Sequence, residues 1–258
     1  MATIETNESP ATRPALRWLW SLLIHPRKTL AEIAEADKPN WLTPMLALSG
    51  TGALAVLANG IVRARLALSG EVTLPPDFQW WTAEQQAQYL QAAQSVNGPV
   101  FLYLLPLLAV LLKLWLGWLV VGGLLHLALT LMGGRGAGVQ ALNLAAWASL
   151  PFAARDVLRA VVVLASQKLI AAPGLAGFVP AAEGFGTGFA AALLGMVDLF
   201  LIWHLVLLIL GGLAYAGLGK PRVIGGALLA RLVPTAIYAA VLAGLSQLGS
   251  LTFIRPFF

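Results

Sequence analysis

Long apolar segments separated by short polar ones dominate this chain. Five of these segments are long enough to cross a bilayer, which takes about 20 mostly apolar residues. None alternates between apolar and polar positions as a barrel strand does. The pattern therefore predicts an all-α membrane bundle of five transmembrane helices, over residues 43–62, 99–132, 139–165, 186–218 and 225–250.

Two short amphipathic segments precede the first predicted span. Residues 15–24 combine tryptophans and leucines with Arg17 and Ser21, which is typical of a short helix lying in the membrane interface. The alternative is a disordered tail. The stretch TLAE at 29–32 fits the capping box of a second short helix. We expect residues 1–41 to form a cytoplasmic segment with these helices, and residues 42–252 to form the transmembrane domain.

The longest polar stretch lies between the first and second spans. Thr82 and Gln85 fit a capping box, which predicts a glutamine-rich helix on the extracytoplasmic side, ending near Val96. Trp80, Trp81 and Tyr89 would rest on the outer interface or on a partner.

Composition supports a membrane protein. Hydrophobic residues make up 59% of the chain and charged residues 10%, against about 25% charged residues in soluble domains. Cysteine is absent, which excludes disulfides and thiolate metal sites. No cluster of basic and aromatic residues indicates nucleic-acid binding, and no motif implies a cofactor.

Loop charges predict the orientation of the spans. With the N-terminus in the cytoplasm, eight basic residues fall on the inside and four on the outside, which favours a cytoplasmic N-terminus and an extracytoplasmic C-terminus. The inner residues are Arg13, Arg17, Arg27, Lys28, Lys38, Arg135, Lys220 and Arg222, and the outer ones are Arg63, Arg65, Lys168 and Arg255.

The glycine-rich stretch at 133–138 separates the second and third spans. A phosphate-binding loop would need a closing GK[ST] between a strand and a helix, and this stretch has neither. Because glycine tolerates left-handed backbone angles, it ends a helix at low cost. We therefore expect a tight cytoplasmic reversal.

This region also resembles a known family. The sequence HLALTLMGGRGAGVQALNLAAWASLP at 126–151 is similar to the central signature of bacterial-type Yip-family membrane proteins, and residues 25–44 and 198–219 resemble the family's amphipathic entry and fourth span. The resemblance implies a five-helix bundle with a cytoplasmic N-terminus. The family's eukaryotic members bind Rab GTPases through longer N-terminal regions, so that role does not carry over.

Charged residues inside spans are costly and mark candidate functional sites. At roughly 1.5 Å per residue, five of them lie about 24 to 31 Å from the cytoplasmic ends of their spans, near the outer boundary of a core about 30 Å thick. Asp156 can pair with Arg159, and Asp198 with Lys113 or Arg155. The cluster would be a structural ion network or a binding site for an anionic headgroup or solute. Its members are Lys113, Arg155, Asp156, Arg159 and Asp198.

Other intramembrane features indicate packing. Ala236, Ala240 and Gly244 form a small-residue stripe that lets a second helix approach closely. Prolines inside three spans predict kinks. His126 and His204 stand alone and are expected to be packed core histidines, with no metal.

No catalytic constellation is evident, so we expect a protein that is not an enzyme. The favoured function is a scaffold or accessory subunit in a bacterial inner membrane. It would contact lipids and other integral membrane proteins or a second copy of itself. The alternatives are a small-solute transporter or channel, resting on the intramembrane charges, and a lipid-organising protein that shapes the membrane, resting on the tryptophan-rich N-terminal segment.

Overall fold

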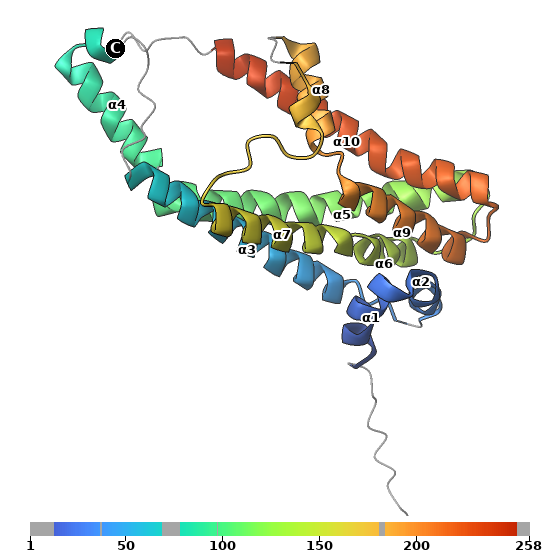
Figure 1. Cartoon of the computed structure of the whole chain (residues 1–258). Coiled ribbons are helices and arrows are strands. Elements are labelled where there is room, and N and C mark those ends of the chain that lie inside the picture. The colour runs from blue at the N-terminus through green and yellow to red at the C-terminus, as the bar shows by residue number, and fades with distance from the viewer. Residues whose placement is uncertain (1–12, 37, 69–77, 97, 181–183, 252–258) are drawn as a thin grey trace, which may run out of the picture.

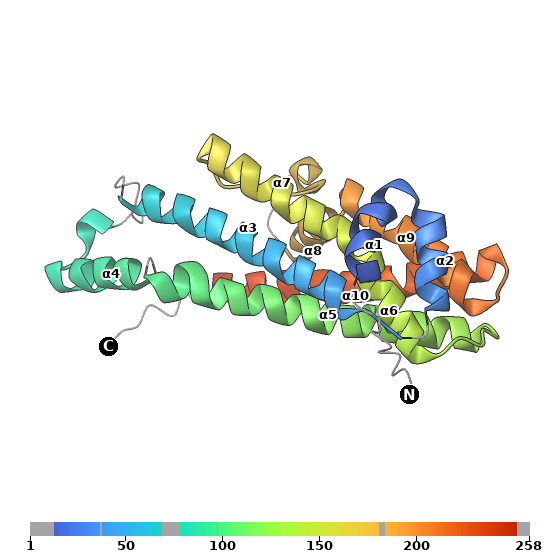
Figure 2. The ribbon, with the colours of Figure 1, turned by 90° about the horizontal axis from the view of Figure 1, so that it is seen from below.

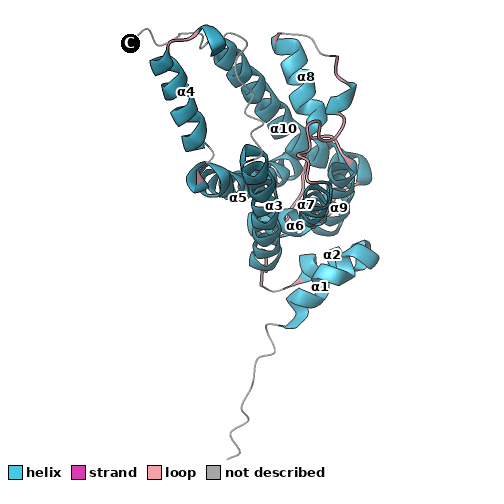
Figure 3. Ribbon diagram, turned by 60° about the vertical axis from the view of Figure 1, so that its left-hand side comes forward, coloured by secondary structure: helices cyan, strands magenta, loops and turns pink. Residues whose placement is uncertain are grey.

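The computed structural model describes residues 13–36, 38–68, 78–96, 98–180 and 184–251 (Figure 1). Every regular element in these residues is helical (Figure 3). The α-helices are α1 (Arg13–Ile24), α2 (Pro26–Glu35), α3 (Leu42–Leu68), α4 (Ala83–Val96), α5 (Leu105–Leu131), α6 (Gly138–Ala148), α7 (Leu150–Ser166), α8 (Phe185–Gly195), α9 (Leu199–Ala216) and α10 (Lys220–Leu251). Short turns η1 (Phe78–Trp80), η2 (Val100–Leu104) and η3 (Ala176–Phe178) lie between them.

Four of the described helical segments are long and apolar enough to cross a membrane: Leu42–Ala67, Val100–Leu131, Leu199–Ala216 and Lys220–Gln247. The predicted span at 139–165 is instead divided into α6 and α7, which meet at Ser149. Pro151 accounts for this break, because its ring lacks the N–H that a continuous helix would use. The fold is therefore an α-helical membrane bundle, but a count of five continuous spans is not confirmed.

The prediction of one helix over 186–218 is also wrong, because residues 196–198 separate α8 from α9. Asp198 is extended and caps α9, accepting a hydrogen bond from the Leu201 N–H at 2.8 Å. On the other side of the break, Gly174 has a φ of +59° and packs against the last carbonyls of α8. The Leu175 N–H donates to the Leu194 carbonyl at 2.9 Å. A loop from before α8 therefore ends that helix.

Helices α1 and α2 pack together on one side of the bundle, over α6 and α9 (Figure 2). Leu22 and Leu30 are completely buried there. The predicted capping box at 29–32 is wrong, because α2 begins earlier, at Pro26, where a missing N–H costs nothing. Glu32 instead accepts a hydrogen bond from the Trp18 indole at 3.1 Å, which joins the two helices.

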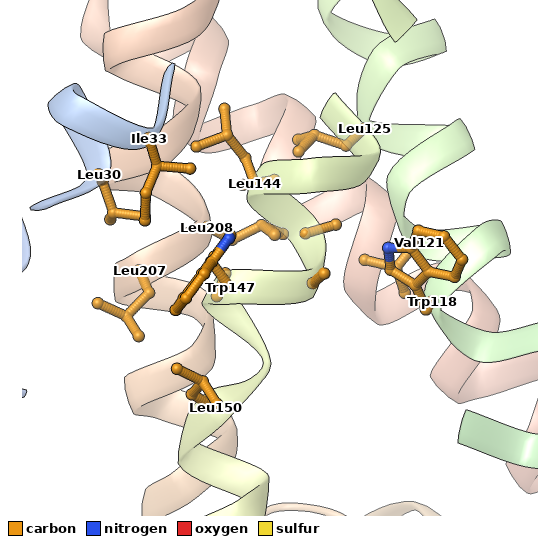
Figure 4. Close-up of a cluster of buried hydrophobic side chains, with 14 of the residues drawn as sticks. Leu30, Ile33, Trp118, Val121, Leu125, Leu144, Trp147, Leu150, Leu207 and Leu208 are labelled. Atoms are coloured by element: carbon orange, nitrogen blue, oxygen red, sulfur yellow. The ribbon is translucent and has the colours of Figure 1, made fainter. Parts of the chain in front are cut away.

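The main core lies where these N-terminal helices meet α6 and α9 (Figure 4). Trp147 is fully buried at its centre, with its ring edge-on to Trp18 at 5.6 Å. Leu144, Leu207 and Leu208 surround it. This core fixes α1 and α2 to the bundle.

A second aromatic group joins α5 to the start of α3. Trp41 stacks on Trp118 at 4.9 Å between ring centroids, and the Trp118 indole donates to the Leu142 carbonyl at 2.8 Å. A Cβ on Gly122 would stand 2.6 Å from the Leu142 side chain, so glycine there permits the close approach of α5 and α6.

The glycine-rich stretch makes the predicted tight reversal between α5 and α6. Gly133 has a φ of +94°, and the Gly134 N–H donates to the Leu129 carbonyl at 2.8 Å. The Gly133 N–H also donates to the Thr130 carbonyl, at 2.9 Å. The two hydrogen bonds satisfy carbonyls that would otherwise be free at the end of α5. Beyond the reversal, a Cβ on Gly136 would overlap the Tyr215 ring, so the loop is pressed against α9.

Helix α4 leads away from the ends of α3 and α5 (Figure 1). Thr82 and Gln85 form the capping bonds that the sequence indicates, with N–H to side-chain oxygen distances of 3.1 and 3.2 Å. Trp81 packs edge-on against Tyr89 at 5.5 Å, whereas Trp80 is exposed. The extracytoplasmic location of α4 stays a prediction.

Candidate functional site

The polar cluster is centred on the carboxylate of Asp198, at the first turn of α9. One oxygen caps the helix through the Leu201 N–H. The other accepts from the Arg159 guanidinium at 3.4 Å and lies 3.8 Å from that of Arg155. The Asp198 side chain is 13% exposed, and the arginine side chains are 23% and 32% exposed. With Asp156, which pairs with Arg155, the structure therefore brings four of the five predicted residues together and joins α7 to α9.

Asp156 pairs differently from the prediction. Its carboxylate lies 3.3 Å from the Nε of its neighbour Arg155. Within the described part of the chain, no ion pair forms between Asp156 and Arg159. Arg155 thus lies close to the carboxylates of both Asp156 and Asp198. Among the described residues, Arg159 forms an ion pair with Asp198 alone.

Lys113 lies apart from the ion pairs. Asp198 takes Arg155 as its partner, and the Lys113 ammonium instead lies over the ring of Tyr238 on α10, 4.4 Å from its centroid. The side chain is exposed at the surface of the bundle. Among the described residues, no carboxylate is within ion-pair distance of it.

Sequence reasoning missed two members of the site, Arg231 and Phe152. The guanidinium carbons of Arg155 and Arg231 lie 4.7 and 5.1 Å from the centroid of the Phe152 ring. Arg231 is only 12 residues from Gly219, about 18 Å along a helix, so counting along the chain places it outside the predicted layer. Arg231 is the one charged residue in the last predicted span, and this was the feature from which its role could have been predicted.

His204 completes the contacts around Phe152. The two rings are 4.9 Å apart, and the His204 Nδ1 is 2.9 Å from the Ala148 carbonyl. As predicted, it is a buried core histidine. Its Nε2 and the Nε of Arg231 are both buried, and neither has a hydrogen-bond partner among the described residues. His126 also has partners, since its Nδ1 is 2.9 Å from the Tyr215 hydroxyl.

The cations Lys113, Arg155 and Arg159 lie within helices, whereas Asp198 stands at the start of α9. The apolar helix that contains Lys113 begins at Val100, 13 residues earlier, about 20 Å away at 1.5 Å per residue. Helix α7 continues to Ser166, seven residues past Arg159. The location of the cluster near the outer boundary of the membrane stays a prediction.

The arrangement can hold helices together and can attract anions. Four cations, Lys113, Arg155, Arg159 and Arg231, stand against the two carboxylates of Asp156 and Asp198. Both carboxylates of this site already form ion pairs with arginines, and that of Asp198 also caps α9. No group of three His, Asp or Glu side chains that could hold a metal ion occurs among the residues described.

The predicted small-residue stripe lies beside the contact between α8 and α10. Ala239 and Ala243 are buried positions of α10, and the latter lies 3.7 Å from where a Cβ on Gly188 would stand. The predicted residues Ala236, Ala240 and Gly244 are half-buried, and a Cβ on Gly244 would meet nothing within 4 Å. Their role in packing against another subunit stays a prediction.

Long apolar helices with an ion-paired cluster inside the bundle define a multi-pass α-helical membrane protein. A family model, the Yip1 domain, matches residues 20–245. The chain therefore belongs to the Yip1 domain family, as its sequence resemblance indicated. No curated protein and no solved structure matches it.

Proposed function

We propose that this protein is a non-enzymatic scaffold or accessory subunit of a larger membrane complex, with its N-terminus in the cytoplasm of a bacterial cell. The observation that carries the proposal is Lys113, whose side chain is exposed on the face shared by α5 and α10 and whose ammonium lies over the Tyr238 ring. A lysine at the centre of a membrane helix costs about 2.5–3.5 kcal/mol. An aspartate or glutamate on a partner's membrane helix offsets this cost by pairing with it.

The surface next to Lys113 suits a second helix. Gly117 lies one turn further along α5, and a Cβ built there would meet no atom of the described residues within 4 Å. Small residues let helix backbones approach closely in lipid, which would bring a partner's carboxylate within reach of Lys113. Tyr238, itself 37% exposed, extends this surface onto α10.

The contacts inside the bundle favour this function over the two alternatives. A transport pathway would need the charged groups to be available to a solute, whereas Asp198, Arg155 and Arg159 are bound to one another. Membrane shaping would need a free amphipathic helix, whereas Leu22 of α1 is completely buried against the bundle.

The absence of native cysteines allows a direct test by single-cysteine photocrosslinking in intact membranes. Gly117→Cys, labelled with a photoreactive maleimide, should crosslink to another integral membrane protein or to a second copy. Ile202→Cys on α9, 56% exposed, is the matched lipid-facing control and should give lipid adducts.

The Lys113 pairing is then tested in the same background. Lys113→Gln should abolish the crosslink, whereas Lys168→Gln, outside the predicted spans, should preserve it. Replacing the partner's acidic residue by lysine together with Lys113→Glu should restore it. A crosslink that survives Lys113→Gln unchanged, or the absence of any protein crosslink at Gly117, would overturn the proposal.

A further inference from the structure

A groove with a basic edge lies where α2 crosses α9, away from the polar cluster. Two adjoining hollows of about 350 and 460 Å³ form it, and both are lined by Arg27 and Leu210. Figure 1 shows α2 nearly end-on where α9 runs lengthwise, so the two helices cross steeply. We call this feature the basic groove. It is also lined by Lys28, Val206 and Lys220.

The basic groove has a cationic edge and an apolar wall. Arg27, Lys28 and Lys220 are exposed, and no carboxylate among the described residues is within ion-pair distance of them. The wall is formed by leucine and valine side chains of α9, of which Val206 is 47% exposed. Its ligand must therefore bring both negative charge and apolar surface.

Lys220 adds a second reason for an anion at this place. It is the first residue of α10, where the helix dipole is positive and where a lysine is unfavourable. A bound anion would be attracted by the lysine and by the helix terminus together. Gly217, with a φ of +63°, makes the tight turn that places this helix start beside the end of α9.

We propose that the basic groove binds the headgroup of an anionic phospholipid. The phosphate lies between Arg27 and Lys220, and an acyl chain lies along Val206 and Leu210. Clusters of basic residues beside membrane helices recognise such headgroups, and arginine matches phosphate geometry with two parallel hydrogen bonds. A soluble phosphate would leave the apolar wall unused, which favours a lipid. The site is independent of the Lys113 surface.

Native mass spectrometry of the full chain in mild detergent provides the test, with phosphatidylglycerol as the probe. Wild type should retain one molecule at least 10-fold more tightly than phosphatidylcholine. Arg27→Gln/Lys220→Gln should weaken binding roughly 25-fold, since each cation contributes similarly. The control pair Lys38→Gln/Arg135→Gln removes the same charge from exposed positions outside the groove and should change binding less than threefold.

Two further experiments distinguish binding of a lipid from binding of a soluble anion. Val206→Trp fills the apolar wall without changing charge and should weaken phosphatidylglycerol about 10-fold. Excess glycerol 3-phosphate should not displace the lipid. If the double variant does not fold, Lys220→Gln alone should weaken binding about fivefold relative to Lys38→Gln.

Three results would overturn the proposal. Equal losses of lipid affinity in the two double variants would mean that the lipid is attracted by the net positive charge of the protein and not by this groove. Unchanged binding in Val206→Trp would mean that the wall is not used. Displacement by glycerol 3-phosphate would mean that the groove holds a soluble anion.

Discussion

Replacing Asp198 should reveal how much the polar cluster contributes to the stability of the bundle. Its carboxylate caps α9 and pairs with two arginines. Losing an N-cap side chain costs about 1 kcal/mol. Removing one partner of a buried ion pair costs about 3–5 kcal/mol, and the lower figure applies here because Arg155 and Arg159 are partly exposed. Asp198→Ala should therefore lower the free energy of unfolding by about 4 kcal/mol.

The two contributions can be separated, because asparagine caps helices as well as aspartate does. Asp198→Asn should cost about 3 kcal/mol, leaving the cap in place. Adding Arg159→Gln should recover part of this loss, since it removes a cation left without its carboxylate. Asp156→Asn is the control, because Asp156 pairs only with its neighbour Arg155 in the described contacts.

Unfolding in mixed micelles of mild detergent and dodecyl sulfate, followed by far-ultraviolet circular dichroism, measures these free energies. Equal stability of Asp198→Asn and wild type would refute the ion-pair contribution. Equal stability of Asp198→Asn and Asp198→Ala would refute the cap. The first result would mean that α7 and α9 are joined mainly by apolar packing.

Further substitutions test the packing. Gly122→Ala should destabilise the bundle by about 1–3 kcal/mol because its Cβ would overlap a side chain of α6. Gly123→Ala, whose Cβ would meet no described atom within 4 Å, should not destabilise it and should gain up to about 1 kcal/mol in the same assay. Trp147→Ala should cost about 3–5 kcal/mol because the side chain is fully buried, and Trp20→Ala, at a 71% exposed position, should cost little. Thr82→Ala should weaken α4 locally by about 1 kcal/mol. Hydrogen exchange of the first turn of α4 should then accelerate without a change in global stability.

The sequence predicted a helix well where the residues of that helix alone determine its extent. Apolar length identified the helices that can cross a membrane, and the capping residues Thr82 and Gln85 marked the start of α4. Asp198 was a local signal for the start of α9, but the end of α8 could not be predicted from its own stretch, because a distant loop at Gly174 packs against it. The start of α2 was missed because Pro26 begins the helix before the capping pattern at 29–32.

The polar cluster was predictable only in part, because residue spacing gives the level of a side chain along its helix but not its contacts with other helices. Counting residues along helices placed Arg155, Arg159 and Asp198 at one level, and these residues do meet. Counting cannot follow a long side chain across to another helix, so the reach of Arg231 to Phe152 was missed. The direction of Lys113 depends on how α5 is rotated against α10, which the spacing of residues does not fix.

The burial of α1 and α2 has a consequence for the order in which the chain is made. Leu22 and Leu30 are synthesised well before Trp147 and Leu208, but they are buried in the core that they form with these residues. More than 100 residues must therefore be synthesised before these helices can dock. Helices α1 and α2 can therefore reach their final place only after α6 and α9 have been synthesised.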